Sequence, residues 1–86
     1  MREIIKKCSQ EFFTEVLAGR KKFELRLDDE DYSVGDILVL KEKDENLKLT
    51  GREVRKKITF VLKTKELKYF KKEDVERYGF VVMSLD

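Results

Sequence analysis

The hydrophobic pattern of the first part of the chain changes period twice, which predicts a strand followed by a helix and a second strand. Residues 2–7 form a short run centred on two isoleucines, as in a strand. From Ser9 the apolar residues recur at helical spacing, and four are predicted to share one helix face: Phe12, Phe13, Val16 and Leu17. Ser9 is a suitable N-cap and Gly19 a suitable terminating glycine, so the helix is predicted over residues 9–18.

Residues 22–27 alternate strictly between polar and apolar side chains, which is the period of a β-strand. The alternation predicts that the apolar set enters the core, namely Phe23, Leu25 and Leu27. It places the charged set together on the opposite face, namely Lys22, Glu24 and Arg26. The second strand is therefore expected to present charged side chains on one side of the sheet.

The remaining pattern predicts three more strands. The acidic residues 28–31 are expected to form a loop, residues 33–36 and 44–46 turns, and residues 37–40 a strand buried on both faces. A long strand follows and carries Val54, Ile58, Phe60 and Leu62. Lys56 falls on its apolar register, where we expect a bulge or an exposed strand end. Residues 63–78 are ambiguous, with one or two helical turns at 73–78 closed by Gly79, and residues 80–85 form the last strand.

These elements predict an α+β domain that is mainly β. Five or six mostly antiparallel strands and one amphipathic helix near the N-terminus fit a small barrel, closed or partly open, with the helix over one opening. A length of 86 residues suits one domain spanning residues 1–86. The apolar content of 41% is enough for a core, although 44% of the residues are charged.

Composition limits the kinds of site and partner that we expect for this chain. A net charge of +2 is weak for a dedicated duplex-DNA protein, although basic residues cluster at 20–22, 52–57 and 68–72. There is no histidine and the single cysteine, Cys8, is expected to be a buried small hydrophobe, so we expect no disulfide framework, no metal and no cofactor. No signal peptide or long apolar run is visible, which predicts a cytoplasmic protein without a membrane partner.

Lys21, Glu24 and Arg26 form the sharpest candidate site. Lys21 and Arg26 could hold a phosphate or a base carbonyl, while Glu24 accepts a hydrogen bond from an exocyclic amine or a 2′-hydroxyl. The alternative is an exposed strand face with a salt bridge from Glu24 to Arg26 or Arg55, stabilising by at most about 1 kcal/mol. Spacing alone favours this structural alternative.

A second group could extend a binding surface beyond that strand. Arg52, Arg55 and Lys57 could extend a basic strip from this site, and Thr50 beside Gly51 could let a ligand approach the backbone. They could equally be turn and solvent-facing residues. Tyr32, Tyr69 and Phe70 could stack on a base, although aromatic side chains in so small a domain are more often part of the core.

Four segments of the chain resemble a known family. Residues 19–26, Gly-Arg-Lys-Lys-Phe-Glu-Leu-Arg, are similar to the G-x-K-x-x-E-x-R signature of ASCH domains, which belong to the PUA-like superfamily. Residues 32–38, Tyr-Ser-Val-Gly-Asp-Ile-Leu, resemble the (F/Y)-x-V-G-D-x-L segment that follows it. Residues 49–52 and 78–82 resemble short stand-alone ASCH-like proteins of bacteria and phages, so the similarity spans nearly the whole chain.

The resemblance implies a PUA-like β-barrel with a groove between helix and barrel that binds RNA, a nucleotide or a modified base. Some members are amide hydrolases of N-acylated cytidine, and a ribonuclease activity is also described. Those hydrolases use a lysine, matched by Lys21, and a threonine whose position Glu24 occupies. The chain also lacks the histidine that precedes the helix in short members, and residues 27–30 are more acidic than their counterparts.

Three functions follow as hypotheses. The first is a module that binds RNA or a nucleotide through Lys21, Lys22, Glu24, Arg26, Thr50, Arg52 and Arg55. The second is a small hydrolase of nucleoside derivatives or RNA, in which Lys21 and Glu24 would be the catalytic pair. The third is a protein-interaction domain that uses an exposed apolar or charged surface. The missing threonine and histidine favour binding over catalysis.

Overall fold

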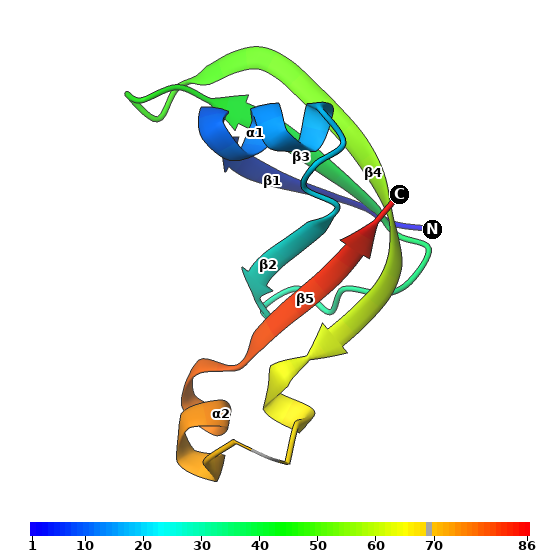
Figure 1. Ribbon diagram of the computed structural model, residues 1–86, viewed down its shortest axis with the longest axis vertical. Helices are drawn as coiled ribbons and strands as arrows, with labels where there is room; N and C mark the ends of the chain where they lie inside the picture. The colour runs from blue at the N-terminus through cyan, green and yellow to red at the C-terminus, as the bar shows by residue number, and fades with distance from the viewer. Residues whose placement is uncertain (69) are drawn as a thin grey trace.

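The fold is one five-stranded sheet that bends over on itself around the core. The computed structural model describes residues 1–68 and 70–86. The strand order is β1-β3-β4-β5-β2, with α1 beside the end of β1 and α2 at the far end of the molecule (Figure 1). The elements are β1 (Glu3–Ser9), α1 (Gln10–Leu17), β2 (Phe23–Leu27), β3 (Ile37–Lys43), β4 (Leu49–Lys63), a 3₁₀ turn (Thr64–Glu66), α2 (Lys72–Tyr78) and β5 (Phe80–Leu85).

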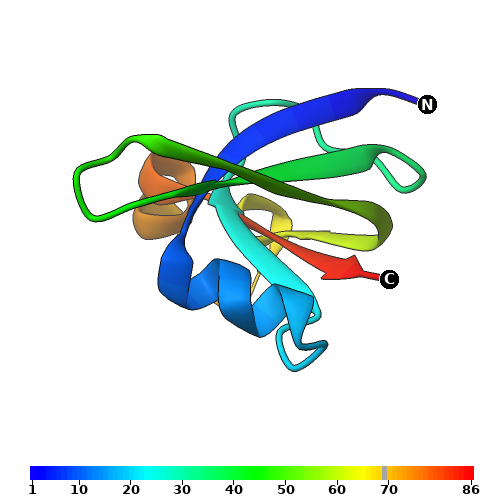
Figure 2. The ribbon, with the colours of Figure 1, turned by 90° about the horizontal axis from the view of Figure 1, so that it is seen from above.

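The sheet is open. Its β1–β3 pairing is parallel, and the other three pairings are antiparallel. Seen from above, β1 and β3 lie on one side and β2 and β5 on the other, with β4 crossing between them (Figure 2). Within the described residues β1 and β2 are the two sheet edges and do not pair, so the sheet is not closed into a barrel. The mainly β α+β class with one main helix is confirmed.

Strand β4 joins the two halves of the sheet because it pairs with a different neighbour in each half. Its first part pairs with β3 and its last part with β5, and the β5 register shifts between Ile58 and Phe60. Ile58 and Val61 therefore both face the core, whereas Phe60 faces outward. The prediction of a bulge or an exposed strand end at Lys56 is wrong: Lys56 lies inside β4 and pairs regularly with Leu38.

Helix α1 begins and ends where the sequence predicts. Ser9 is its N-cap, with the Ser9 hydroxyl accepting a hydrogen bond from the Phe12 N–H at 3.5 Å, and Gly19 follows its C-terminus with φ +79°. Phe13 is buried, but Phe12 remains 52% exposed. The prediction that all four apolar residues share the buried face is wrong for Phe12 and Leu17, because neighbouring helix residues point about 100° apart.

Strand β2 has the predicted alternation but the opposite orientation. Glu24 is 4% exposed, while the exposed fractions of Phe23, Leu25 and Leu27 are 51%, 55% and 57%. The prediction that these three apolar residues enter the core is therefore wrong. Alternation fixes which residues share a face, but it does not fix which face turns inward.

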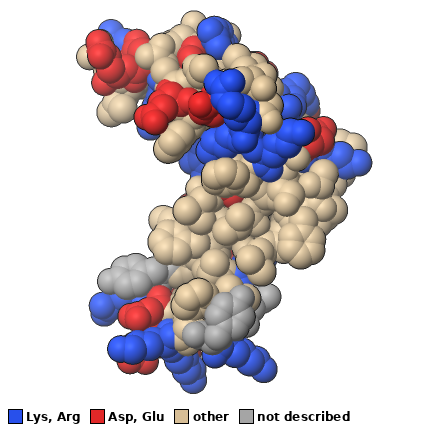
Figure 3. Space-filling view, in the orientation of Figure 1, with Lys and Arg blue, Asp and Glu red and all other residues tan. Residues whose placement is uncertain are grey.

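The outward side of β2, β5 and the end of β4 is a continuous apolar surface, which we call the outer face. The strand register aligns its side chains in rows, with Leu25 opposite Val82 and Val82 opposite Leu62. Figure 3 shows this region as a tan band between two charged ends of the molecule. The outer face consists of Phe23, Leu25, Leu27, Phe60, Leu62, Phe80, Val82 and Ser84.

The other predicted elements are confirmed as β1, β3, β5 and α2, and Gly79 ends α2. The predicted turn at 33–36 holds the start of β1 in place, because the Asp36 carboxylate accepts hydrogen bonds from the backbone N–H groups of Arg2 and Ser33. Tyr69 lies outside the described residues. Neither helix in the described part of the chain is long and apolar enough to cross a lipid bilayer.

Candidate functional site

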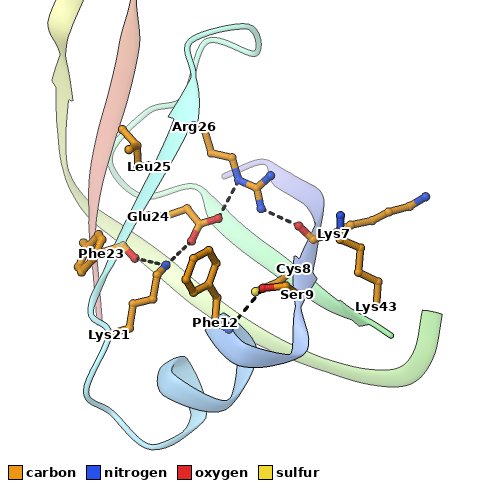
Figure 4. Close-up of a pocket in the computed structure, with 10 residues that line it drawn as sticks. All are labelled: Lys7, Cys8, Ser9, Phe12, Lys21, Phe23, Glu24, Leu25, Arg26 and Lys43. Carbon is orange, nitrogen blue, oxygen red and sulfur yellow. Dashed lines mark hydrogen bonds and ion pairs between the residues drawn. The ribbon is translucent and has the colours of Figure 1, made fainter. Parts of the chain in front are cut away.

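A pocket of about 390 Å³ lies between the free edges of β1 and β2, where the sheet stays open. Ser9 ends β1 and caps α1, so the first turn of the helix forms part of the rim (Figure 4). The second wall is β2. The pocket is lined by Lys7, Cys8, Ser9, Phe12, Lys21, Phe23, Glu24, Leu25, Arg26 and Lys43.

Glu24 is the buried acidic group of this pocket, and both of its oxygens are occupied. Lys21 Nζ lies 2.9 Å from Glu24 Oε1, and Arg26 Nε lies 2.7 Å from Glu24 Oε2. The side chains of Lys21 and Arg26 are 13% and 25% exposed, so all three groups are largely removed from water. A carboxylate can be buried this deeply because two cations compensate it.

The same two cations also satisfy backbone groups at the sheet edges. Lys21 Nζ donates to the Phe23 carbonyl at 2.9 Å, and Arg26 Nη2 donates to the Lys7 carbonyl at 2.8 Å (Figure 4). Edge carbonyls without a strand partner need another donor. Arg26 therefore links β2 to β1 across the opening of the sheet.

Two half-exposed aromatic rings flank the pocket. The ring centroids of Phe12 and Phe23 lie 5.4 Å and 4.8 Å from Lys21 Nζ, within cation–π range. Four cationic side chains line the pocket against the single carboxylate of Glu24. The site therefore combines flat apolar surfaces with an excess of positive charge.

Cys8 forms part of the inner wall. Burial raises the pKa of its thiol, and the nearby carboxylates of Glu24 and Glu42 raise this pKa further, while Lys21 and Arg26 partly oppose them. A thiol with a raised pKa stays protonated and is a poor nucleophile. Among the described residues, no three carboxylate or thiol side chains gather in a way that could hold a metal ion.

The residues proposed from the sequence do not all lie in one place. Lys21, Glu24 and Arg26 come together in the pocket, whereas Lys22 is exposed and is not among the lining residues. Arg55 forms an ion pair with Glu3, and this guanidinium lowers the pKa of the Glu3 carboxyl.

Thr50 and Arg52 gather around Glu42, which is 4% exposed. The Thr50 hydroxyl donates to Glu42 Oε1 at 2.6 Å, and Arg52 Nε lies 3.5 Å from the same oxygen. The Arg52 guanidinium also lies 5.0 Å from the centroid of the Phe13 ring. These contacts give Thr50 and Arg52 a clear structural role at the β3–β4 hairpin.

Sequence reasoning missed Lys7, Phe12 and Lys43 as pocket residues. Phe12 had a signal, because adjacent helix residues point about 100° apart and two neighbouring phenylalanines cannot both lie at the centre of the buried face. Lys7 and Lys43 had none, since their positions depend on how β1 and β3 pair. Of the candidate stacking residues, Tyr32 is 2% exposed and belongs to the core, and Phe70 lines a different pocket beside α2.

A family model described as "Domain of unknown function (DUF3850)" matches residues 5–85. The chain belongs to the DUF3850 family. This match includes every residue that lines the pocket, so the site lies within the part of the chain that matches the DUF3850 domain. A search of curated protein sequences gave no match.

A solved structure shares this fold. The crystal structure of hypothetical protein PH0355 superposes with a TM-score of 0.67 at 18% sequence identity, covering 100% of this chain and 98% of that chain. At this level of identity the similarity extends to the fold. The bent, open sheet of this DUF3850 chain is therefore an arrangement also seen by crystallography.

Proposed function

We propose that the pocket between β1 and β2 binds RNA, a nucleotide or a modified base. The observation that carries the proposal is the convergence of Lys21, Glu24 and Arg26 in one pocket bordered by two half-exposed phenylalanines. Its volume of about 390 Å³ falls in the range of small-ligand sites. As part of the same proposal, we assign the chain to the ASCH-like group of the PUA-like superfamily, since these three residues carry the signature.

The chemistry of the pocket suits a planar, partly anionic ligand. The rings of Phe12 and Phe23 offer faces on which a base can stack, a contact that contributes about 1–3 kcal/mol per base in single-stranded nucleic-acid complexes. Arg26 uses two of its five N–H donors in the contacts with Glu24 and Lys7. The excess of cations in the lining attracts phosphate.

Hydrolysis is the weaker candidate. The groups that it would use, Lys21 and Glu24, are bound to each other and to Arg26 or Phe23. The thiol of Cys8 has a pKa raised by burial, which opposes a role as nucleophile. Binding therefore requires fewer changes to these existing contacts than hydrolysis does.

The test is a binding titration with a panel of short single-stranded RNAs, nucleoside monophosphates and modified nucleosides, followed by fluorescence anisotropy or calorimetry. We expect Arg26→Gln and Lys21→Gln each to weaken binding at least tenfold, because each removes a charge-assisted contact of about 1.4 kcal/mol or more. Arg55→Gln is the matched control, since Arg55 is an arginine paired with a glutamate outside the pocket.

Two results would contradict the proposal. One is the absence of binding by the unmodified protein to every member of the panel at millimolar concentration. The other is an equal loss in Arg55→Gln, which would mean that net charge alone governs affinity. Amide chemical-shift changes confined to the pocket lining would support the site independently of affinity.

A further inference from the structure

The outer face is an unpartnered apolar surface in a protein that is otherwise rich in charge. Charged residues make up 44% of the sequence, yet among the described residues the outer face carries no Lys, Arg, Asp or Glu side chain. Its single polar member is Ser84. Most of the charged side chains visible in Figure 3 lie above and below this surface.

The exposed area is large for a monomer. Phe23, Phe60 and Phe80 are 51%, 60% and 43% exposed, and the leucines beside them are exposed to a similar degree. Because an aromatic side chain carries roughly 150–250 Å², the outer face leaves on the order of 600 Å² of apolar surface in water. Contiguous apolar patches of this size on soluble monomers usually mark an interaction site.

We propose that the outer face is the interface of a homodimer in which two copies pack sheet against sheet. A standard interface removes about 800 Å² from each partner, so this face supplies roughly three quarters of the area and a polar rim supplies the rest. The size of the outer face therefore favours a second copy over a small ligand, which would cover only part of the face.

The composition of the surface also favours self-association. In a two-fold interface each patch meets itself, so a charge near the two-fold axis would approach its own copy and repel it. A face without charges avoids this cost. Rows of leucine, valine and phenylalanine on two facing sheets can interdigitate as they do in β-sandwiches, at a sheet separation of about 10 Å.

The proposed interface is continuous with the pocket. Phe23 and Leu25 belong to the outer face and also line the pocket. A second copy seated on the outer face therefore lies at the mouth of the pocket beside β2. The dimer itself does not depend on what the pocket binds.

The test is sedimentation velocity and multi-angle light scattering over a range of protein concentrations. We expect a species of twice the 10.3 kDa chain mass at micromolar concentrations. Phe60→Glu should raise the dimer dissociation constant at least about 100-fold, because two carboxylates would be buried in an apolar interface without partners. Phe60 is 60% exposed and does not line the pocket, so the fold and the binding site should be unchanged.

Ile5→Glu is the matched control, because Ile5 is 59% exposed on a strand that does not contribute to the outer face. It should leave the dimer intact. Leu62→Lys provides a second variant in case Phe60→Glu unfolds, and circular dichroism checks folding of each. A protein that stays monomeric at every concentration would overturn the proposal, as would a dimer that survives both variants or is lost equally in Ile5→Glu. A monomer that binds lipid vesicles through Phe60 would also overturn it, in favour of a membrane surface.

Discussion

Glu24 and Glu42 are both 4% exposed, and each is held by partners that satisfy it, yet their surroundings differ. Glu24 lies on edge strand β2 and takes one cation on each oxygen, Lys21 and Arg26, so the cluster keeps one excess positive charge. Glu42 lies on β3 inside the sheet and receives the Thr50 hydroxyl and one arginine on the same oxygen, so its charge is balanced.

Burial of a carboxylate therefore does not by itself make a site. The partners of Glu42 satisfy it within a hairpin. The cations around Glu24 also contact edge carbonyls and line an open pocket. What distinguishes Glu24 is the adjacent gap in the sheet. The comparison can be tested by perturbing the two glutamates in parallel.

The largest expected effect is on stability. Glu24→Ala leaves Lys21 and Arg26 partly buried without a counter-charge, and we expect a loss of about 3 kcal/mol in the free energy of unfolding. Glu42→Ala removes one acceptor from a hydroxyl and from a half-exposed arginine, and should lower the free energy of unfolding by about 1–2 kcal/mol. Urea unfolding at one fixed protein concentration measures both values. Equal losses would mean that the two clusters are energetically alike.

A smaller effect is expected at the hydroxyl partner of Glu42. Thr50→Val keeps the shape of the side chain and removes the 2.6 Å hydrogen bond to Glu42, so it should cost about 1 kcal/mol. In a double-mutant cycle with Glu42→Gln, most of this loss should appear as coupling between the two positions. Ligand affinity should not change, because Thr50 lies outside the pocket. A weakened ligand affinity would place Thr50 in the binding surface after all.

The smallest effect is expected on the pKa of the Cys8 thiol. Both glutamates raise the pKa of its thiol, Glu24 more than Glu42, so Glu24→Gln should lower the apparent pKa of alkylation by iodoacetamide more than Glu42→Gln does. The folded pKa lies above the ordinary value of 9.0, so the associated stability is fully present below pH 9.0 and is lost as the pH rises through the folded pKa. Cys8→Ala should remove that part of the alkaline destabilisation. The opposite order of the two shifts would place Cys8 closer to the Glu42 cluster.

Local signals predicted the elements well. Ser9 and Gly19 mark the ends of α1 because capping is decided within a few residues, and residues 80–85 form β5 as their pattern predicts. The grouping of Lys21, Glu24 and Arg26 was also accessible, since all three lie within residues 21–26, at and just before the start of β2. Which face of that strand turns inward depends on β5 and on the opening beside β1, and neither is encoded within residues 22–27.

For the same reason, features that depend on pairing between distant strands could not be predicted from the sequence. Lys7 and Lys43 enter the pocket through the parallel pairing of β1 with β3, which brings Ser9 opposite Lys43. Thr50 and Arg52 share a basic segment with Arg55, yet their partners are Glu42 and Glu3 on different strands. Sequence proximity grouped these residues, and strand register separated them.

The register shift between Ile58 and Phe60 determines how well the outer face withstands changes in the sequence. With Ile58 facing the core, an unbroken strand would also turn Phe60 and Leu62 inward and leave Val61 and Lys63 outside. The apolar character of the outer face thus depends as much on whether the number of residues between two pairing partners is odd or even as on the residue types. Loss of a single residue there would exchange the two sides of the strand, even though every hydrophobic side chain of the outer face was still present in the sequence.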